Sequence, residues 1–141
     1  MLGLPRILLL LLLVPFSMDS SISLSGNPLP MTINTATAGS QPNSVTDTST
    51  TYSVLSLVTA TIVGSLNAAL PTGVSLTVTL APPALATSAG PVIMTTTNQT
   101  LVSGIVVLVT ITGLQITYKL SATVHAAPVT NATALVTFTI Q

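Results

Sequence analysis

The sequence contains very few charged residues, and this scarcity limits what the chain can bind. Only 3% of its 141 residues are charged, whereas about a quarter is typical of soluble domains. The basic residues are Arg6 and Lys119, the acidic residues are Asp19 and Asp47, and the net charge is zero. Nucleic acids and anionic lipids attract clustered Lys and Arg, so we expect neither as a partner. Zero net charge also removes repulsion between copies, which favours self-association.

Cysteine and glutamate are absent, and histidine occurs once, as His125. A zinc site takes three or four ligands from His, Cys, Asp and Glu, and this chain has too few of them. Calcium prefers several carboxylates, and glycoside cleavage generally uses two, but only Asp47 lies away from the N-terminal segment. No glycine immediately precedes Lys119, so a phosphate-binding loop is also missing. We therefore predict no metal, no cofactor and no catalytic residue.

A serine nucleophile is the catalytic possibility that the residue types leave open. Serines, His125 and Asp47 are all present, and such triads are defined by geometry rather than by sequence order. No G-x-S-x-G elbow accompanies them. His125 and Lys119 both fall in the outward phase of a strand pattern, where an ordinary exposed histidine and a solubilising lysine are the default interpretations. A non-enzymatic protein is the expectation, with a serine hydrolase as the remote alternative.

Tryptophan is absent, and aromatic residues make up 3% of the chain. Tyr118 and Phe138 fall in the inward phase of alternating segments, which is typical of core residues. A surface on which sugar rings could stack is therefore poorly supplied.

The N-terminal segment has the pattern of a secretory signal. Arg6 is followed by the apolar run from Ile7 to Val14 and then by Pro15. The run is shorter than the roughly 20 residues that a membrane-spanning helix needs. We predict a signal peptide over residues 1–20, cut between about 17 and 25, and a secreted or cell-surface location with no membrane span after cleavage. An uncleaved membrane anchor is the alternative.

Most of the remaining chain alternates between apolar and hydroxyl-bearing residues, as strands with one buried face do. The clearest alternation covers Val74 to Leu80, Leu114 to Val124 and Val136 to Ile140. Denser apolar runs from Tyr52 to Gly64 and from Ile105 to Thr112 indicate strands that are buried on both sides or broken by a bulge. Turn signals separate these segments, including one at Thr112-Gly113.

This spacing predicts an all-β fold, an antiparallel immunoglobulin-like β-sandwich of about seven strands preceded by a signal-peptide helix. Residues 51–141 form the predicted sandwich domain. Residues 38–50 are rich in Gly, Ser, Pro, Asn and Thr and are predicted to be a linker or loop. Residues 21–37 are either an ordinary first strand or an arm that pairs with the sheet of a neighbouring subunit.

Two N-x-[ST] sequences lie in predicted turns, where a glycosyltransferase could reach them. They are Asn98-Gln99-Thr100 and Asn131-Ala132-Thr133. Asn98 and Asn131 are therefore candidate glycosylation sites if the host glycosylates exported proteins.

Four segments carry a resemblance to known proteins: ATSAGPV (86–92), TTTNQTLVSGI (95–105), ITYKLSATV (116–124) and VTFTI (136–140). In these segments the chain resembles small secreted bacterial surface proteins of uncharacterised function. The resemblance implies a single immunoglobulin-like sandwich and an exported surface protein, with no catalytic residue. In general character the chain also resembles fimbrial subunits, although the paired cysteines of many such subunits are absent.

Two functions from different classes are therefore expected. The first is a non-enzymatic structural or cell-surface protein that associates with itself, or with other surface components, into an extracellular assembly. The second is a monomeric adhesion or carbohydrate-binding module that contacts its ligand through loops. The first predicts oligomers or filaments, and the second predicts a monomer with a saturable ligand.

Overall fold

The computed structural model describes residues 20–106, 109–130 and 132–141, and over these residues the chain is all-β with no helix. The predicted signal peptide lies outside the described residues except for Ser20. The described residues contain ten strands, in chain order β1 (Ser21–Leu24), β2 (Val45–Asp47), β3 (Thr51–Ser56), β4 (Ala60–Leu66), β5 (Val74–Leu80), β6 (Thr87–Ser88), β7 (Val92–Ile93), β8 (Gln99–Ile105), β9 (Val109–Ala122) and β10 (Val136–Ile140). The expected number of about seven was too low, mainly because β2, β6 and β7 are only two or three residues long.

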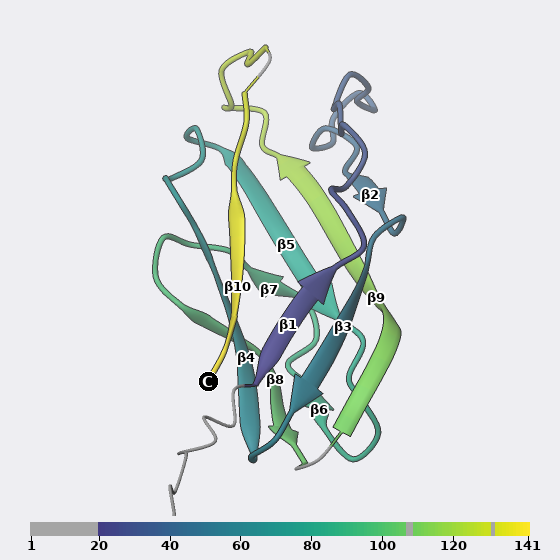
Figure 1. Ribbon diagram of the computed structural model, residues 1–141. Helices are drawn as coiled ribbons and strands as arrows, with labels where there is room; N and C mark the ends of the chain where they lie inside the picture. The colour runs from purple at the N-terminus through teal and green to yellow at the C-terminus, as the bar shows by residue number, and fades with distance from the viewer. Residues whose placement is uncertain (1–19, 107–108, 131) are drawn as a thin grey trace, which may run out of the picture.

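The strands form two antiparallel sheets that face each other as a sandwich (Figure 1). The larger sheet has the order β1-β3-β9-β5-β7, and β2 also pairs with β9. The smaller sheet has the order β10-β4-β8-β6. The long strand β9 is central to the larger sheet, because β5 pairs along one side of it while β2 and β3 together pair along the other.

From β3 to β10, each connection passes from one sheet to the other. Strands that pair with each other within a sheet are therefore never consecutive in the chain. This arrangement leaves β10, the last strand, at one edge of the smaller sheet, and β1, the first strand, at an edge of the larger sheet on the same side of the molecule (Figure 1).

The alternation of apolar and hydroxyl side chains determines which face of each strand is buried. In β5 the predicted inward residues Leu76, Val78 and Leu80 are buried, while the intervening hydroxyl residues are partly exposed. Thr side chains on the outward face are β-branched and suit the extended backbone. The inward side chains of both sheets form one core, which includes Tyr52, Val54, Ile62, Leu76, Val78, Leu80, Leu101, Val102, Ile105, Ile116 and Tyr118.

The structure confirms two of the clearest predicted strands and corrects the denser ones. The predicted strands 74–80 and 136–140 coincide with β5 and β10. The run 52–64 is two strands in different sheets, because the chain crosses the sandwich between β3 and β4. The run 105–112 contains the end of β8 and the beginning of β9.

The turn expected at Thr112-Gly113 is wrong, because β9 continues through this position. Gly113 has a φ of 73°, a left-handed conformation that glycine adopts without steric cost. Here the glycine allows a bend inside a long strand rather than a chain reversal, as the curved lower part of β9 indicates (Figure 1). The strand begins at Val109, before the predicted start at Leu114, and ends at Ala122, two residues before the predicted limit.

The segment before the main strands is partly built into the larger sheet. Ser21–Leu24 pairs with β3 of the same chain, in a register that places Ile22 opposite Val54. The predicted linker 38–50 contains β2, which pairs with β9 next to Tyr118. Between β1 and β2 the chain forms a long connection that lies at one end of the sandwich (Figure 1).

Candidate functional site

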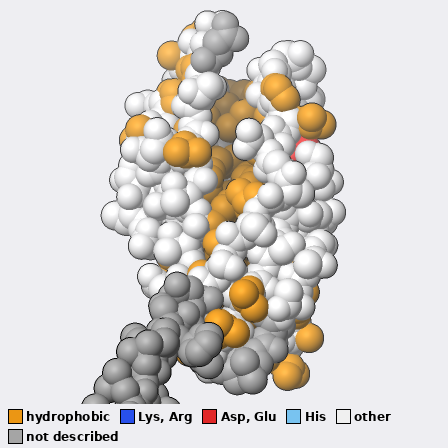
Figure 2. Space-filling model, in the orientation of Figure 1, with side chains coloured by type: hydrophobic (Ala, Val, Ile, Leu, Met, Phe, Trp, Pro, Cys, Tyr) orange, Lys and Arg blue, Asp and Glu red, His pale blue; other side chains and the backbone are white. Residues whose placement is uncertain are grey.

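The described structure contains a cavity of about 1150 Å³ at one end of the sandwich. One wall is the long connection after β1, from Gly26 to Ala36, and the opposite wall is the segment around Pro128 to Val136. Its floor includes side chains of β5 and β9, namely Val74, Leu76, Tyr118, Leu120 and Ala122. Figure 2 shows apolar side chains along the floor of a cleft between these two walls.

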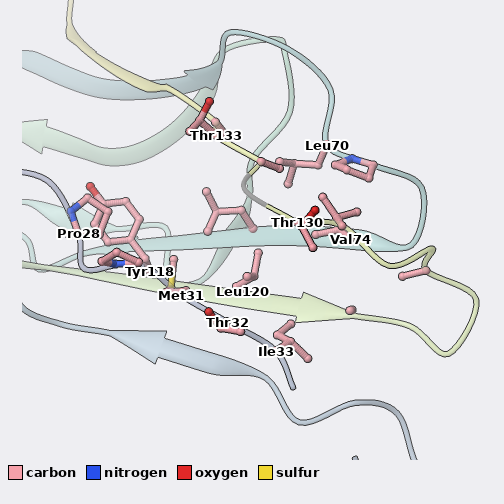
Figure 3. A pocket seen from close by; sticks show the side chains of 18 of the residues that line it. Pro28, Met31, Thr32, Ile33, Leu70, Val74, Tyr118, Leu120, Thr130 and Thr133 are labelled. Carbon is pink, nitrogen blue, oxygen red and sulfur yellow. The ribbon is translucent and has the colours of Figure 1, made fainter. Parts of the chain in front are cut away.

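The cavity has an apolar and uncharged lining. Val74 and Leu120 line it from β5 and β9, and Leu70 lines it from the connection before β5 (Figure 3). Met31 and Ile33 come from the connection after β1. Hydroxyls at the site include those of Tyr118, Thr32, Thr130 and Thr133. No Asp, Glu, Lys, Arg or His is among the described residues that line the cavity. A site of this composition suits an uncharged, partly apolar occupant, because an ion would lose its hydration without gaining a partner.

Tyr118, on the cavity floor, has a shifted pKa. It lies opposite Asp47 in the pairing of β2 with β9, and its side chain is almost fully buried. Burial raises the pKa of Tyr118, and the nearby carboxylate of Asp47 raises it further. The phenol is therefore neutral at physiological pH and offers a hydrogen-bond donor and acceptor rather than a nucleophilic phenolate.

The cavity lining includes Leu24 at the end of β1 and Val136 at the start of β10. These two edge strands come close to each other. In β10 the alternate residues Val136, Phe138 and Ile140 point inward, but they are only half-buried. In β1, Ile22 is half-buried and Leu24 is 43% exposed. The sandwich is thus less completely closed on this side than in its centre, where the core side chains are buried.

Asp47, Lys119 and His125 are not among the residues that line this site. Asp47 Oδ2 accepts a hydrogen bond from Ser49 Oγ at 2.8 Å. Lys119 is exposed on the outward face of β9, and His125 is exposed in the turn that follows it. Among the described residues, His125 makes no hydrogen bond to Asp47 or to a serine, and no three His, Cys, Asp or Glu side chains cluster as metal ligands would. In the part of the chain that the structure describes, no helix is long and apolar enough to cross a membrane.

The two candidate glycosylation sites differ in what the structure says of them. Asn98 is exposed in the bend just before β8, where an enzyme could reach its amide. Asn131 lies outside the described residues.

The sequence did not identify the cavity. Its lining comes from segments that are distant in the chain, mostly Pro, Ala, Thr and Leu residues in connections that resemble ordinary loops. The one signal in the sequence was the patchy apolar alternation of residues 22–33, which includes Met31 and Ile33. Tyr118 was expected in the core, and it is buried there while also contributing to the cavity floor.

Comparisons with protein-family models, with curated proteins and with solved structures found no match to this chain. Any function proposed for the chain therefore rests on its sequence, its fold and the geometry of this site.

Proposed function

We propose that this chain is a non-enzymatic exported structural or cell-surface protein that associates with copies of itself. The observation that carries this proposal is the incompletely closed side of the sandwich. There, two edge strands lie beside an uncharged cavity, and their inward apolar side chains are only half-buried. Covering such a surface with another protein removes apolar area from water, at about 25 cal/mol per Å².

The near-absence of charge supports the same proposal. Among the described residues only Asp47 and Lys119 carry a formal charge, so electrostatic repulsion between copies is weak. The signal-like pattern of residues 1–20 supports export. Within this proposal the fold is an immunoglobulin-like sandwich in the broad sense of two facing antiparallel sheets, and the chain belongs with small secreted bacterial surface proteins. Its sheet-to-sheet connections differ from the immunoglobulin arrangement, in which the last two strands are neighbours in one sheet.

The test is the size of the purified protein. The full chain is expressed from Met1 in a secreting host, and its mass identifies the N-terminus that remains after export. Size-exclusion chromatography with light scattering, followed by negative-stain microscopy, then measures assembly. Oligomers or filaments support the proposal, whereas a monomer at all accessible concentrations overturns it. A parallel chain lacking residues 20–36 asks whether the segment containing β1 is needed for assembly or only for folding.

The cavity favours a second candidate, a monomeric module that binds an uncharged ligand. Its volume of about 1150 Å³ is slightly above the usual range for small-molecule sites, about 300 to 1,000 Å³. In this second function the chain is an adhesion or carbohydrate-binding module. Its ligand lies over the apolar floor of the cavity and accepts hydrogen bonds from, or donates them to, the hydroxyls of Tyr118, Thr130 and Thr133. Titration of a monomeric sample with neutral oligosaccharides and with a neutral apolar dye tests it. Saturable binding that Leu120→Gln weakens, with Ile93→Gln on the exposed edge strand β7 as control, supports this second function.

A further inference from the structure

The hydrogen-bonding pattern of β10 shows which of its backbone groups are free to pair with another strand. Gln141 N donates to Thr61 O at 2.9 Å, and Thr61 N donates to Gln141 O at 2.7 Å, so these two residues exchange both hydrogen bonds. In an antiparallel ladder such pairs alternate with pairs that exchange none. The register of β10 on β4 is continuous, so Thr139 and Thr137 also point their backbone groups toward β4.

The N–H and C=O groups of Val136, Phe138 and Ile140 consequently point away from β4. β10 is the edge strand of its sheet, and within the described residues no strand other than β4 pairs with it. These same three residues contribute the inward, half-buried side chains of the strand. β10 therefore offers unpaired backbone groups and incompletely buried apolar side chains at the same three positions.

β10 also lacks the features that usually protect an edge strand, which are charge, proline, a bulge or very short length. β6 and β7, at the far edges, are two residues long, and Pro91 precedes β7. β10 is five residues long, and its sequence VTFTI contains neither charge nor proline. It is the longest of the strands at the sheet ends, and its pairing with β4 shows no register shift.

Charge favours a second copy of the same sheet as the partner. The four strands of the smaller sheet contain no charged residue, and Asp47 and Lys119 both lie on strands of the larger sheet. Two smaller sheets can therefore meet edge to edge without repulsion. β10 has no charged side chain with which a charged partner strand could form an ion pair, whereas a second copy of β10 matches it in length and side-chain pattern.

We propose that two copies of the chain pair through β10 in an antiparallel, two-fold symmetric arrangement, so that the smaller sheets form one continuous sheet. Phe138 of one copy lies opposite Phe138 of the other, and Val136 lies opposite Ile140. This register is the one in which all three outward-facing residues of both copies exchange hydrogen bonds. It also places the two Phe side chains next to each other on the inward face, where aromatic pairs are favourable. The inference rests on the proposed self-association and names the surface that makes it.

The register makes a specific prediction about the exposed threonines of β10. With Phe138 on the two-fold axis, Thr137 of one copy lies opposite Thr139 of the other. The double variant Thr137→Lys with Thr139→Lys places lysine opposite lysine at both positions. The matched variant Thr137→Lys with Thr139→Glu places lysine opposite glutamate at both positions. The two variants alter the same exposed sites, so a difference between them reports the pairing and not the fold.

The experiment is sedimentation velocity on the exported protein, with the N-terminus that remains after secretion, and on both variants prepared in the same way, over a range of concentrations. We expect the Lys/Lys variant to weaken the dimer by about ten-fold or more, and the Lys/Glu variant to dimerise at least as tightly as the native chain. Circular dichroism and urea unfolding check that each variant is folded. If the Lys/Lys variant is unfolded, Thr137→Glu with Thr139→Glu replaces it, with the same expected loss.

The outcomes separate this inference from the function on which it rests. If the native chain associates and the Lys/Lys variant associates equally well, pairing through β10 is overturned while self-association stands. If Lys/Lys and Lys/Glu are weakened equally, the two-fold register around Phe138 is wrong. If the native chain is a monomer throughout, both the proposed self-association and the β10 dimer fail.

Discussion

Thr50 lies just before β3, and its hydroxyl is the one buried side-chain polar atom in the described structure without a hydrogen-bond partner. A buried hydroxyl that loses its bond to water and gains none costs about 1 to 3 kcal/mol. Thr50→Val keeps the branched shape and removes the hydroxyl, so we expect the free energy of unfolding to stay the same or rise by about 1 kcal/mol. Urea unfolding measures it.

Ser56 supplies the matched contrast, because it is equally buried but its Oγ donates a hydrogen bond to the carbonyl oxygen of Val58. Ser56→Ala should lower the free energy of unfolding by about 1 kcal/mol. Equal losses in Thr50→Val and Ser56→Ala would mean that the Thr50 hydroxyl has a partner after all.

Gly73 forms the turn into β5 and is the glycine with the clearest conformational requirement. Its φ is 82°, and an added Cβ would lie 2.7 Å from Thr123 Oγ1 and 3.0 Å from the backbone of Ala126. Gly73→Ala should therefore lower the free energy of unfolding by more than about 1 kcal/mol. Gly26→Ala is the control, since nothing lies within 4 Å of its added Cβ, and thermal unfolding should separate the two variants clearly. Equal melting temperatures would contradict this packing.

Tyr52 predicts how stability responds to alkaline pH. Burial raises its pKa to about 12, from 10 in the unfolded chain, and its hydroxyl donates to the carbonyl oxygen of Ala81 at 2.5 Å. Below pH 10 both states hold the proton, whereas between pH 10 and 12 the unfolded chain releases it first. Stability therefore falls as pH rises through this window, by up to about 3 kcal/mol from this residue, since one pKa unit corresponds to about 1.4 kcal/mol.

Urea unfolding at several pH values between about 8 and 12 checks this slope. Tyr118 contributes in the same direction, since its pKa is also raised. The Tyr52→Phe variant has no phenol to ionise, so its free energy of unfolding should fall less steeply between pH 10 and 12. At about pH 8 its free energy of unfolding should already be lower than that of the native chain, because the hydrogen bond to the carbonyl oxygen of Ala81 is lost. An identical slope in the native chain and in Tyr52→Phe would rule out Tyr52 as the source.

At the scale of the strand, the edge position of β10 predicts an alternating pattern of amide exchange. The N–H groups of Thr137 and Thr139 are held by β4, whereas those of Val136, Phe138 and Ile140 point outward. In a dilute, monomeric sample the outward amides should exchange with solvent much faster than the two threonine amides. Raising the concentration into the dimeric range should slow the outward amides selectively.

Residue-resolved hydrogen exchange by NMR makes this measurement. The Lys/Lys variant of positions 137 and 139 provides the control, because its outward amides should stay fast at high concentration. Protection of Val136, Phe138 and Ile140 in the monomer would show that another strand of the same chain covers them.

Strands in which apolar and hydroxyl residues alternate could be predicted from the sequence. Strands with a continuous apolar run, such as β4, could not be delimited in this way. β5 and β10 were predicted with the correct limits because in each strand apolar residues point inward and hydroxyl residues point outward, which gives a period of two. β4 is buried along most of its length, so the pattern gave no sign that the chain changes sheet before Ala60. The prediction at Gly113 was wrong because a left-handed glycine suits a bend inside a strand as well as a turn.

The candidate site was harder to predict than the strands. VTFTI has the pattern of a strand wherever it lies in a sheet, and its position at an edge depends on which strands pair with it. The cavity is assembled from connections that are widely separated in the chain, such as the segments around Met31 and Thr130. Local periodicity contains no information on either feature, since both are set by sheet order.

At the scale of the whole molecule, the charge distribution predicts how association responds to salt. The smaller sheet is uncharged, so pairing through β10 involves backbone hydrogen bonds and apolar contact rather than ion pairs. Raising sodium chloride from about 0.05 M to about 0.5 M shortens the Debye length severalfold but should change the dimer dissociation constant less than about two-fold. Sodium sulfate should tighten the dimer, because it strengthens apolar burial.

The Lys/Glu variant of positions 137 and 139 makes this prediction sharper, since it adds ion pairs to the same interface. Its dimer should weaken as sodium chloride increases, while that of the native chain should not. Sedimentation of both proteins at matched concentrations compares them directly. A native dimer that dissociates as sodium chloride rises would mean that Asp47, Lys119 or the N-terminal charges form the interface, because these are the groups that salt can screen.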